Sequence, residues 1–194
     1  MTKAQFDKLK PATRRMKMAE DIIKTLALAK TKRFQPMRGA YCLFNIEEAD
    51  EGGFTGKGNT QLRDLLPKFE KHCEACAMGA LLLSHVRLVN HLTVKEADNR
   101  FDGNYINIQD EKIIKVLGGS FSGNDLRVIE AAFEGRNTGY HHLPDEAEEN
   151  CHRWLVLIPD ATKRLRAIMK NIIKHGGEFD ITDLPKKQVS RAAE

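Results

Sequence analysis

The spacing of apolar residues along the chain predicts a mostly helical fold. In several long segments, apolar residues recur three and four positions apart, which is the repeat of one face of an α-helix. Four such segments are residues 11–31, 124–134, 145–157 and the stretch from Asp160 to Ile173. A fifth segment, residues 73–91, is apolar on nearly every side, so we expect it to be the central helix of the core.

Residues with strong positional preferences mark the ends of these helices. Pro11 suits a first helical turn, and Ser122 and Asp160 are typical N-caps. Gly135 is typical of a helix C-terminus, where a left-handed residue is often required. Gly79 lies inside the predicted central helix, and we expect another backbone to pack closely against it there.

Shorter segments complete the predicted fold. They are two helices (61–66, ending before Pro67, and 113–117), two strands (40–46 and 105–108) and an acidic, glycine-rich loop (47–60). We therefore predict an α+β fold that is mostly helical, with about six helices around a central helix containing cysteine and glycine. We expect residues 1–185 to form one compact domain and residues 186–194 to form a flexible basic tail.

Composition places the chain among ordinary globular proteins. It has 194 residues, of which 41% are hydrophobic and 30% charged, enough for one core but too few for a second full domain. Its longest apolar runs are far shorter than the roughly 20 residues of a membrane helix, and its amino end lacks the apolar stretch of a secretory signal. We expect a cytoplasmic protein with no membrane partner.

Charge is distributed unevenly along the chain. Residues 1–40 hold eleven basic and three acidic side chains, a balance of +8, whereas the whole chain has a net charge of +4. This basic region could meet the phosphates of a nucleic acid or an acidic protein. The candidate contact residues are Arg14, Lys17, Lys24, Lys32 and Arg33.

The four cysteines permit more than one kind of chemistry. Cys73 and Cys76 have the Cys-x-x-Cys spacing of a zinc half-site, and Cys151 with His152 is the candidate second half. His141, His142 and Cys42 are further candidates for that half. The same pair could instead be a redox couple or two inert core thiols, and the small residues that follow favour inert thiols.

No complete catalytic motif is present. Residues 42–66 imitate a phosphate-binding loop, but Glu51 stands where that motif needs glycine and Gly58 where it needs Ser or Thr. A nucleophilic Cys76 at a helix N-terminus, with a histidine as base, remains an alternative. The sequence therefore leans away from an enzyme and requires no cofactor, with a structural zinc ion as the alternative.

Four motifs together resemble a group of small uncharacterised proteins from bacteriophages and other mobile elements. They are Arg38-Gly39-Ala40-Tyr41-Cys42, Cys73-x-x-Cys76-Ala77-x-Gly79-Ala80-Leu81, Phe121-Ser122-x-x-x-Leu126-x-x-Ile129-x-x-Ala132-Phe133-Glu134 and Arg166-x-Ile168-Met169-x-Asn171-Ile172-Ile173. The resemblance spans most of residues 16–182. It implies a phage-type origin and a single-domain extent, and it transfers no catalytic residue to this chain.

Our leading hypothesis is a non-enzymatic accessory protein that acts in the cytoplasm of a bacterial host. It would bind a host protein or a protein–nucleic-acid complex, for example as an inhibitor of a host defence system, with direct nucleic-acid contact through the basic amino-terminal region. The alternative is a cysteine- or zinc-dependent enzyme centred on Cys73 and Cys76.

Overall fold

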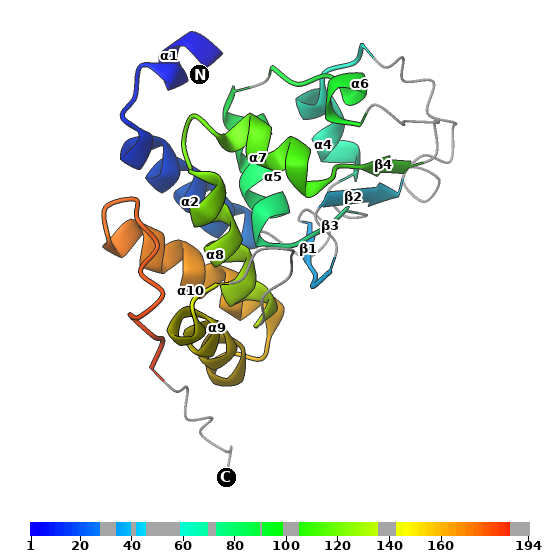
Figure 1. Cartoon of the computed structure of the whole chain (residues 1–194). Coiled ribbons are helices and arrows are strands. Elements are labelled where there is room, and N and C mark those ends of the chain that lie inside the picture. Colours follow the sequence, from blue (N-terminus) through cyan, green and yellow to red (C-terminus); the bar gives the residue numbers. More distant parts are fainter. Residues whose placement is uncertain are drawn as a thin grey trace.

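The computed structural model describes eight stretches of the chain, which hold nine helices and a four-stranded sheet (Figure 1). The described residues are 1–27, 34–39, 42–45, 59–69, 73–89, 91–98, 105–135 and 143–186. This is the mostly helical α+β fold that the hydrophobic pattern predicts. No helix in these stretches combines the length and the apolarity that crossing a bilayer requires.

The helices are labelled in chain order. They are α1 (Lys3–Asp7), α2 (Pro11–Ala27), α4 (Leu62–Phe69), α5 (Ala77–Val89), α6 (Val94–Ala97), α7 (Asp110–Leu117), α8 (Gly123–Glu134), α9 (Asp145–Leu157) and α10 (Ala161–Lys174). The strands are β1 (Gln35–Pro36), β2 (Cys42–Asn45), β3 (Cys73–Ala75) and β4 (Tyr105–Asn107).

The small sheet lies at one side of the helical body (Figure 1). Its strand order is β1-β3-β2-β4, and β1 pairs with β3 in parallel, whereas the other neighbours are antiparallel. In the central pair, Cys42 lies opposite Ala75 and Phe44 lies opposite Cys73. The sheet thereby brings the first cysteine of the chain next to the strand that leads into the central helix.

Helix α5 is the centre of the core, as the sequence predicts. Every residue from Ala77 to Val86 is buried, because α5 packs against α2, α7 and α8 and is in contact with α4. Leu81, Leu82 and Leu83 point to three different sides of the helix and are all fully buried. The apolarity of this segment on all sides thus reflects burial on all sides.

The predicted long helices and their caps are confirmed. The Ser122 hydroxyl accepts a hydrogen bond of 3.1 Å from the Asp125 N–H, and the Asp160 carboxylate accepts one of 2.7 Å from the Lys163 N–H. Gly135 ends α8 in the left-handed region at φ 74°. Pro11 begins α2, and the short helix predicted at 113–117 is the carboxyl half of α7.

Two predicted boundaries are wrong. The cysteine pair does not open the central helix, since Cys73–Ala75 form β3 and α5 begins only at Ala77. Backbone pairing with β1 and β2, both distant in sequence, holds this segment extended. The helix predicted to end before Pro67 continues to Phe69. Pro67 has no N–H and so removes one backbone hydrogen bond of the helix. The burial of Leu62, Leu65 and Leu66 in the core offsets this loss.

Some predictions fall on residues that the structure does not describe. They are residues 28–31 of the first predicted helix, residues 46–58 of the predicted strand end and loop, and residues 187–194 of the predicted tail. Within the described stretches, two short helices were not predicted, α1 and α6. Their five and four residues give too few repeats for the apolar spacing to be recognised.

Candidate functional site

Helices α2 and α10 pack along their length and run antiparallel. The Arg166 Nη2 donates a hydrogen bond of 2.9 Å to the Leu26 carbonyl, near the end of α2. At the other end, Gly177 lies so close to the start of α2 that a Cβ on it would be 2.5 Å from the Ala12 oxygen. Figure 1 shows α10 next to α2; each helix buries one side in the core and exposes the opposite side, and we call these two exposed sides the outer surface of the pair.

This outer surface is basic. Helix α10 carries five basic residues and no acid, and four of them lie on the side opposite its buried residues. Lys17 and Lys24 are seven residues apart and share one face of α2. We call this surface the basic face, and it comprises Lys17, Lys24, Lys163, Arg166, Lys170 and Lys174.

Most cations of the basic face have no neutralising partner. None of the carboxylates that the structure describes pairs with Lys17, Lys24, Lys163 or Lys170. Of the two acids of α2, Asp21 pairs with Arg87 at 2.8 Å and Glu20 is exposed beside the lysines. The positive charge of this surface is therefore available to an external anion.

The five residues predicted to contact a partner have different positions. Lys17 and Lys24 lie on the basic face, whereas Lys32 and Arg33 are outside the described residues. Arg14 is used within the fold: its guanidinium donates to the carbonyls of Leu9 at 2.9 Å, Gly119 at 2.8 Å and Asp7 at 2.5 Å. It thereby ties α1 and α2 to the turn between α7 and α8.

Sequence reasoning missed the cations of α10. The signal was present, because Lys163, Arg166, Lys170 and Lys174 recur three and four positions apart opposite the apolar residues. These cations are far in sequence from residues 1–40, so the sequence did not indicate that they lie near Lys17 and Lys24. Only the packing of α10 on α2 brings the two groups together.

Acidic side chains gather elsewhere, on α9. Asp145, Glu146, Glu148 and Glu149 are exposed in its first turns, where carboxylates also stabilise the helix dipole. Helix α9 packs against α8, and its exposed carboxylates give the described part of the molecule an acidic surface in addition to the basic face.

The predicted metal ligands differ in their exposure. All four cysteines are buried free thiols, and Cys151 lies in the core while its neighbour His152 is exposed. Among the residues that the structure describes, no three His, Cys, Asp or Glu side chains are grouped closely enough to hold a metal ion. His141 and His142 are not described. The zinc site therefore stays a prediction.

Cys76 instead has a buried carboxyl group as its neighbour. Glu130 of α8 is 3% exposed, accepts a hydrogen bond of 3.0 Å from the Met78 N–H at the start of α5, and interacts with the Cys76 thiol. Burial raises the pKa of Glu130 to about 7. Burial and the nearby Glu130 charge raise the pKa of Cys76 well above its usual value, so the thiol is protonated at neutral pH.

A second buried carboxylate lies one helical turn further along α8. Glu134 is 2% exposed, and it accepts hydrogen bonds from the Gly39 N–H at 2.8 Å and from the Arg38 Nε at 3.3 Å. It thus fastens the segment after β1 to α8. Glu130 and Glu134 had no distinguishing pattern in the sequence, since each reads as an ordinary polar position of an amphipathic helix.

An open polar groove of about 600 Å³ lies between α6 and α7. It contains as many carboxylates as lysines: Lys95, Lys112, Lys115, Glu96, Asp98 and Glu111. Glu96 is also engaged in capping α6, where it accepts a hydrogen bond of 2.9 Å from the Thr93 N–H. This balance of charge does not favour one class of ligand, in contrast to the basic face.

No protein-family model matches the chain, and neither a curated protein nor a solved structure is similar to it. The geometry of the described residues is therefore the basis for a functional proposal.

Proposed function

We propose that this chain is a non-enzymatic binding protein whose basic face contacts the phosphate backbone of nucleic acid in a host protein–nucleic-acid complex. The observation that carries the proposal is the basic face itself, where two antiparallel helices present lysines without carboxylate partners among the described residues. Phosphate contacts by lysine and arginine supply most of the sequence-independent affinity of proteins for nucleic acids.

The dimensions of the basic face suit a polyanion. The cations of α10 extend from Lys163 to Lys174, and at 1.5 Å per residue this row is about 16 Å long. One strand of duplex DNA advances about 3.4 Å per phosphate along its axis, so the row matches the rise of roughly five phosphates. Lys17 and Lys24 on α2 widen the face beyond a single row.

The described cysteine chemistry favours binding over catalysis. A cysteine nucleophile needs a thiolate and access for its substrate. Cys76 is 1% exposed, and its pKa is raised by burial and by Glu130. This environment supports a structural thiol.

The resemblance to small proteins of bacteriophages and mobile elements supports the choice of a host partner. Accessory proteins of this kind act in the cytoplasm of the bacterial host, often by binding defence or nucleic-acid machinery. Separate basic and acidic surfaces, here the basic face and α9, accelerate and orient such associations.

The proposal predicts salt-dependent binding to duplex DNA through the basic face. The test variant carries Lys24→Glu and Lys170→Glu, and the matched control carries Lys95→Glu and Lys112→Glu at the groove between α6 and α7. Both variants change the net charge equally. We expect the test variant to lose about tenfold or more in affinity at 0.1 M salt and to reduce the slope of log K against log salt by about two.

Fluorescence anisotropy with a labelled duplex at several salt concentrations measures both quantities. Equal losses in the two double variants would show that only net charge matters and would overturn the basic face as the site. Absence of any binding by the wild type at low salt would exclude nucleic acid as the direct partner.

A further inference from the structure

A segment of the chain beyond α10 folds back onto the helices of the basic face. We call residues 177–186 the C-terminal strap. The reversal occurs at Gly176 and Gly177, whose φ angles of 64° and 104° are left-handed. Gly177 is also the point of close approach to Ala12, where a side chain would clash with the α2 backbone.

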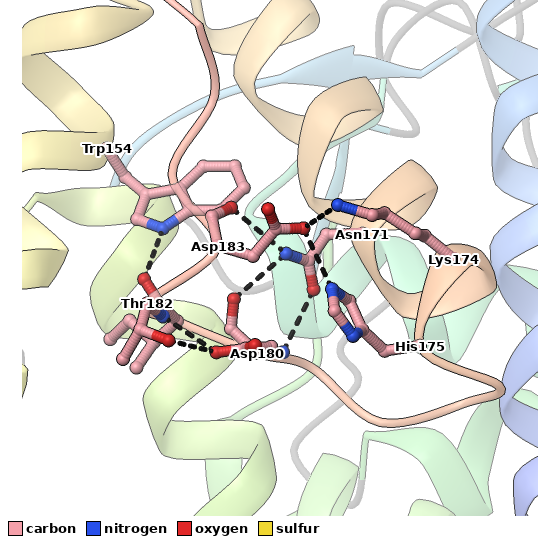
Figure 2. Close-up of polar contacts among 8 residues, drawn as sticks. Trp154, Asn171, Lys174, His175, Asp180, Thr182 and Asp183 are labelled. Carbon is pink, nitrogen blue, oxygen red and sulfur yellow. Dashed lines mark hydrogen bonds and ion pairs between the residues drawn. The ribbon is translucent and has the colours of Figure 1, made fainter.

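Neutral contacts hold the strap in place (Figure 2). The Asn171 side-chain amide donates to the carbonyl of Asp180 at 2.9 Å and accepts from the Asp180 N–H at 2.9 Å. The indole N–H of Trp154 donates to the Ile181 carbonyl at 3.1 Å, and the Phe179 ring packs 5.5 Å from the indole. None of these contacts depends on a charged side chain.

The acids of the strap have a different role, because two of them pair with cations of α2 and α10. Asp183 accepts hydrogen bonds from the Lys174 Nζ at 2.7 Å and the His175 Nε2 at 2.8 Å, as Figure 2 shows. Hydrogen bonds from Lys174 and His175 hold the pKa of Asp183 below its usual value. Glu178 pairs with Arg15 of α2. Arg15 lies on the side of α2 opposite Lys24 and is 12% exposed, so of these contacts only those of Asp183 are at the basic face.

The Asp183 carboxylate occupies the position that a phosphate would take on Lys174, at one end of the basic face. The Lys174 and Asp183 side chains are 63% and 32% exposed, so water and salt reach their contact. Exposed ion pairs of this kind are weak and screened by salt, and an external anion can replace the carboxylate. The neutral anchors would keep the strap docked during such an exchange.

We propose that the C-terminal strap is an autoinhibitory element in which Asp183 competes with the phosphates of a bound nucleic acid for Lys174. The inference rests on the proposed function, because it assigns regulation to the same basic face. It restricts tight binding to polyanions that displace this carboxylate, and it makes the remaining cations the site of first contact.

The decisive comparison is between Asp183→Asn and Asp180→Asn in the full chain. Both remove one negative charge from the strap, but the Asp180 carboxylate accepts its hydrogen bonds from Thr182 and pairs with no described cation. We expect Asp183→Asn to bind a labelled DNA duplex about three- to tenfold more tightly at 50 mM salt, with a salt slope steeper by about one. Asp180→Asn should change the affinity less than twofold.

Emission from Trp154, the single tryptophan of the chain, reports whether the strap stays docked in each variant. Glu178→Gln removes a carboxylate that pairs with Arg15 away from the basic face, so it is a second control and should change the affinity less than twofold. Equal affinities for Asp183→Asn and Asp180→Asn, with a steep salt dependence in the wild type, would overturn autoinhibition and leave the proposed function intact. Failure of the wild type and of Asp183→Asn to bind DNA would overturn both proposals.

Discussion

Glu130 and Cys76 show how a tertiary contact decides the chemistry of a single residue. A cysteine just before a helix N-terminus is often a reactive thiolate, because the helix dipole stabilises negative charge there. In this protein the Glu130 carboxyl group occupies that position and accepts the hydrogen bond from the Met78 N–H. The thiol is therefore buried beside a carboxyl group and keeps its proton.

The raised pKa of Glu130 predicts a characteristic pH dependence of stability. Its pKa is about 7 in the folded protein and near 4.5 in the unfolded chain, so between these values the folded state binds the proton more tightly. The contribution of Glu130 to the free energy of unfolding should then fall by on the order of 3 kcal/mol as the pH rises from 4.5 to 7, and change little above that. Burial lowers the pKa of His85 to about 4, so His85 makes an opposite contribution below pH 6.5 and the wild-type profile alone does not isolate Glu130. Urea denaturation of the wild type and of Glu130→Gln at pH 5, 6, 7 and 8 measures the Glu130 contribution as the difference between them.

The Glu130→Gln variant isolates the contribution of this group. The amide oxygen can still accept from the Met78 N–H, but it carries no charge to desolvate. We expect the stability of the variant relative to the wild type to rise by this amount between pH 4.5 and 7, and the variant to be more stable than the wild type at pH 8. Glu149→Gln, on the exposed side of α9, should keep the pH profile of the wild type. Parallel pH profiles for the wild type and Glu130→Gln would contradict the assignment.

At the scale of elements, the carboxyl end of α8 needs glycine at position 135 for two reasons, the left-handed backbone conformation and the close packing against α9. Gly135 has φ 74°, and a Cβ there would lie 2.4 Å from the side chain of Leu155 on α9. Gly176 after α10 has φ 64°, but a Cβ there would have no atom within 4 Å beyond its neighbours in the chain. The two glycines therefore separate the cost of the left-handed conformation from the cost of a steric clash.

We expect Gly135→Ala to lower the free energy of unfolding by about 2–4 kcal/mol, from about 1 kcal/mol of backbone strain and 1–3 kcal/mol of overpacking. Gly176→Ala should cost about 1 kcal/mol, because only the strain applies. Denaturant unfolding of both variants measures the difference. Equal losses would mean that Leu155 moves aside without cost and that α8 and α9 are not tightly packed at this point.

The sequence predicted correctly the helix ends that are fixed by contacts between residues close in the chain. The caps at Ser122, Asp160 and Gly135 are contacts within a few residues, so the sequence was sufficient to predict them. The segment Cys73–Ala75 is different, since its extended form depends on pairing with strands that begin at residues 35 and 42. The i and i+3 spacing of the cysteines fits a helix equally well, and the sequence alone could not decide between them.

At the scale of the whole molecule, the basic face is assembled by the packing of α10 on α2. The sequence located Lys17 and Lys24 correctly within a basic region, but it assigned Arg14 to a partner, and the structure uses that side chain to join α1 to the body. The cations of α10 are more than a hundred residues away in the chain. Charge counted along the sequence therefore predicted a basic surface but only two of the six residues that form the basic face.

Arg164, which is fully buried at the start of α10, joins this helix to α8 and to the end of α9. Its Nε donates to the Phe133 carbonyl at 2.6 Å, and its Nη1 donates to the carbonyls of Ile158 at 2.6 Å and Pro159 at 2.8 Å. Burial lowers the pKa of Arg164 to about 10, which leaves the guanidinium charged at neutral pH. One side chain thus fixes the end of α8 and the α9–α10 connection against α10.

Arg164→Lys should therefore destabilise the whole molecule although it conserves charge. A lysine ammonium on a flexible stem cannot reproduce the planar arrangement of these donors, and buried carbonyls would lose their partners. We expect the free energy of unfolding to fall by about 3 kcal/mol or more. Arg166→Lys, which loses one bond to Leu26 on a half-buried side chain, should cost about 1 kcal/mol or less. Chemical denaturation measures the free energy of unfolding of both variants. If Arg164→Lys lowers it no more than Arg166→Lys does, the apolar side of α10 alone holds this helix in place.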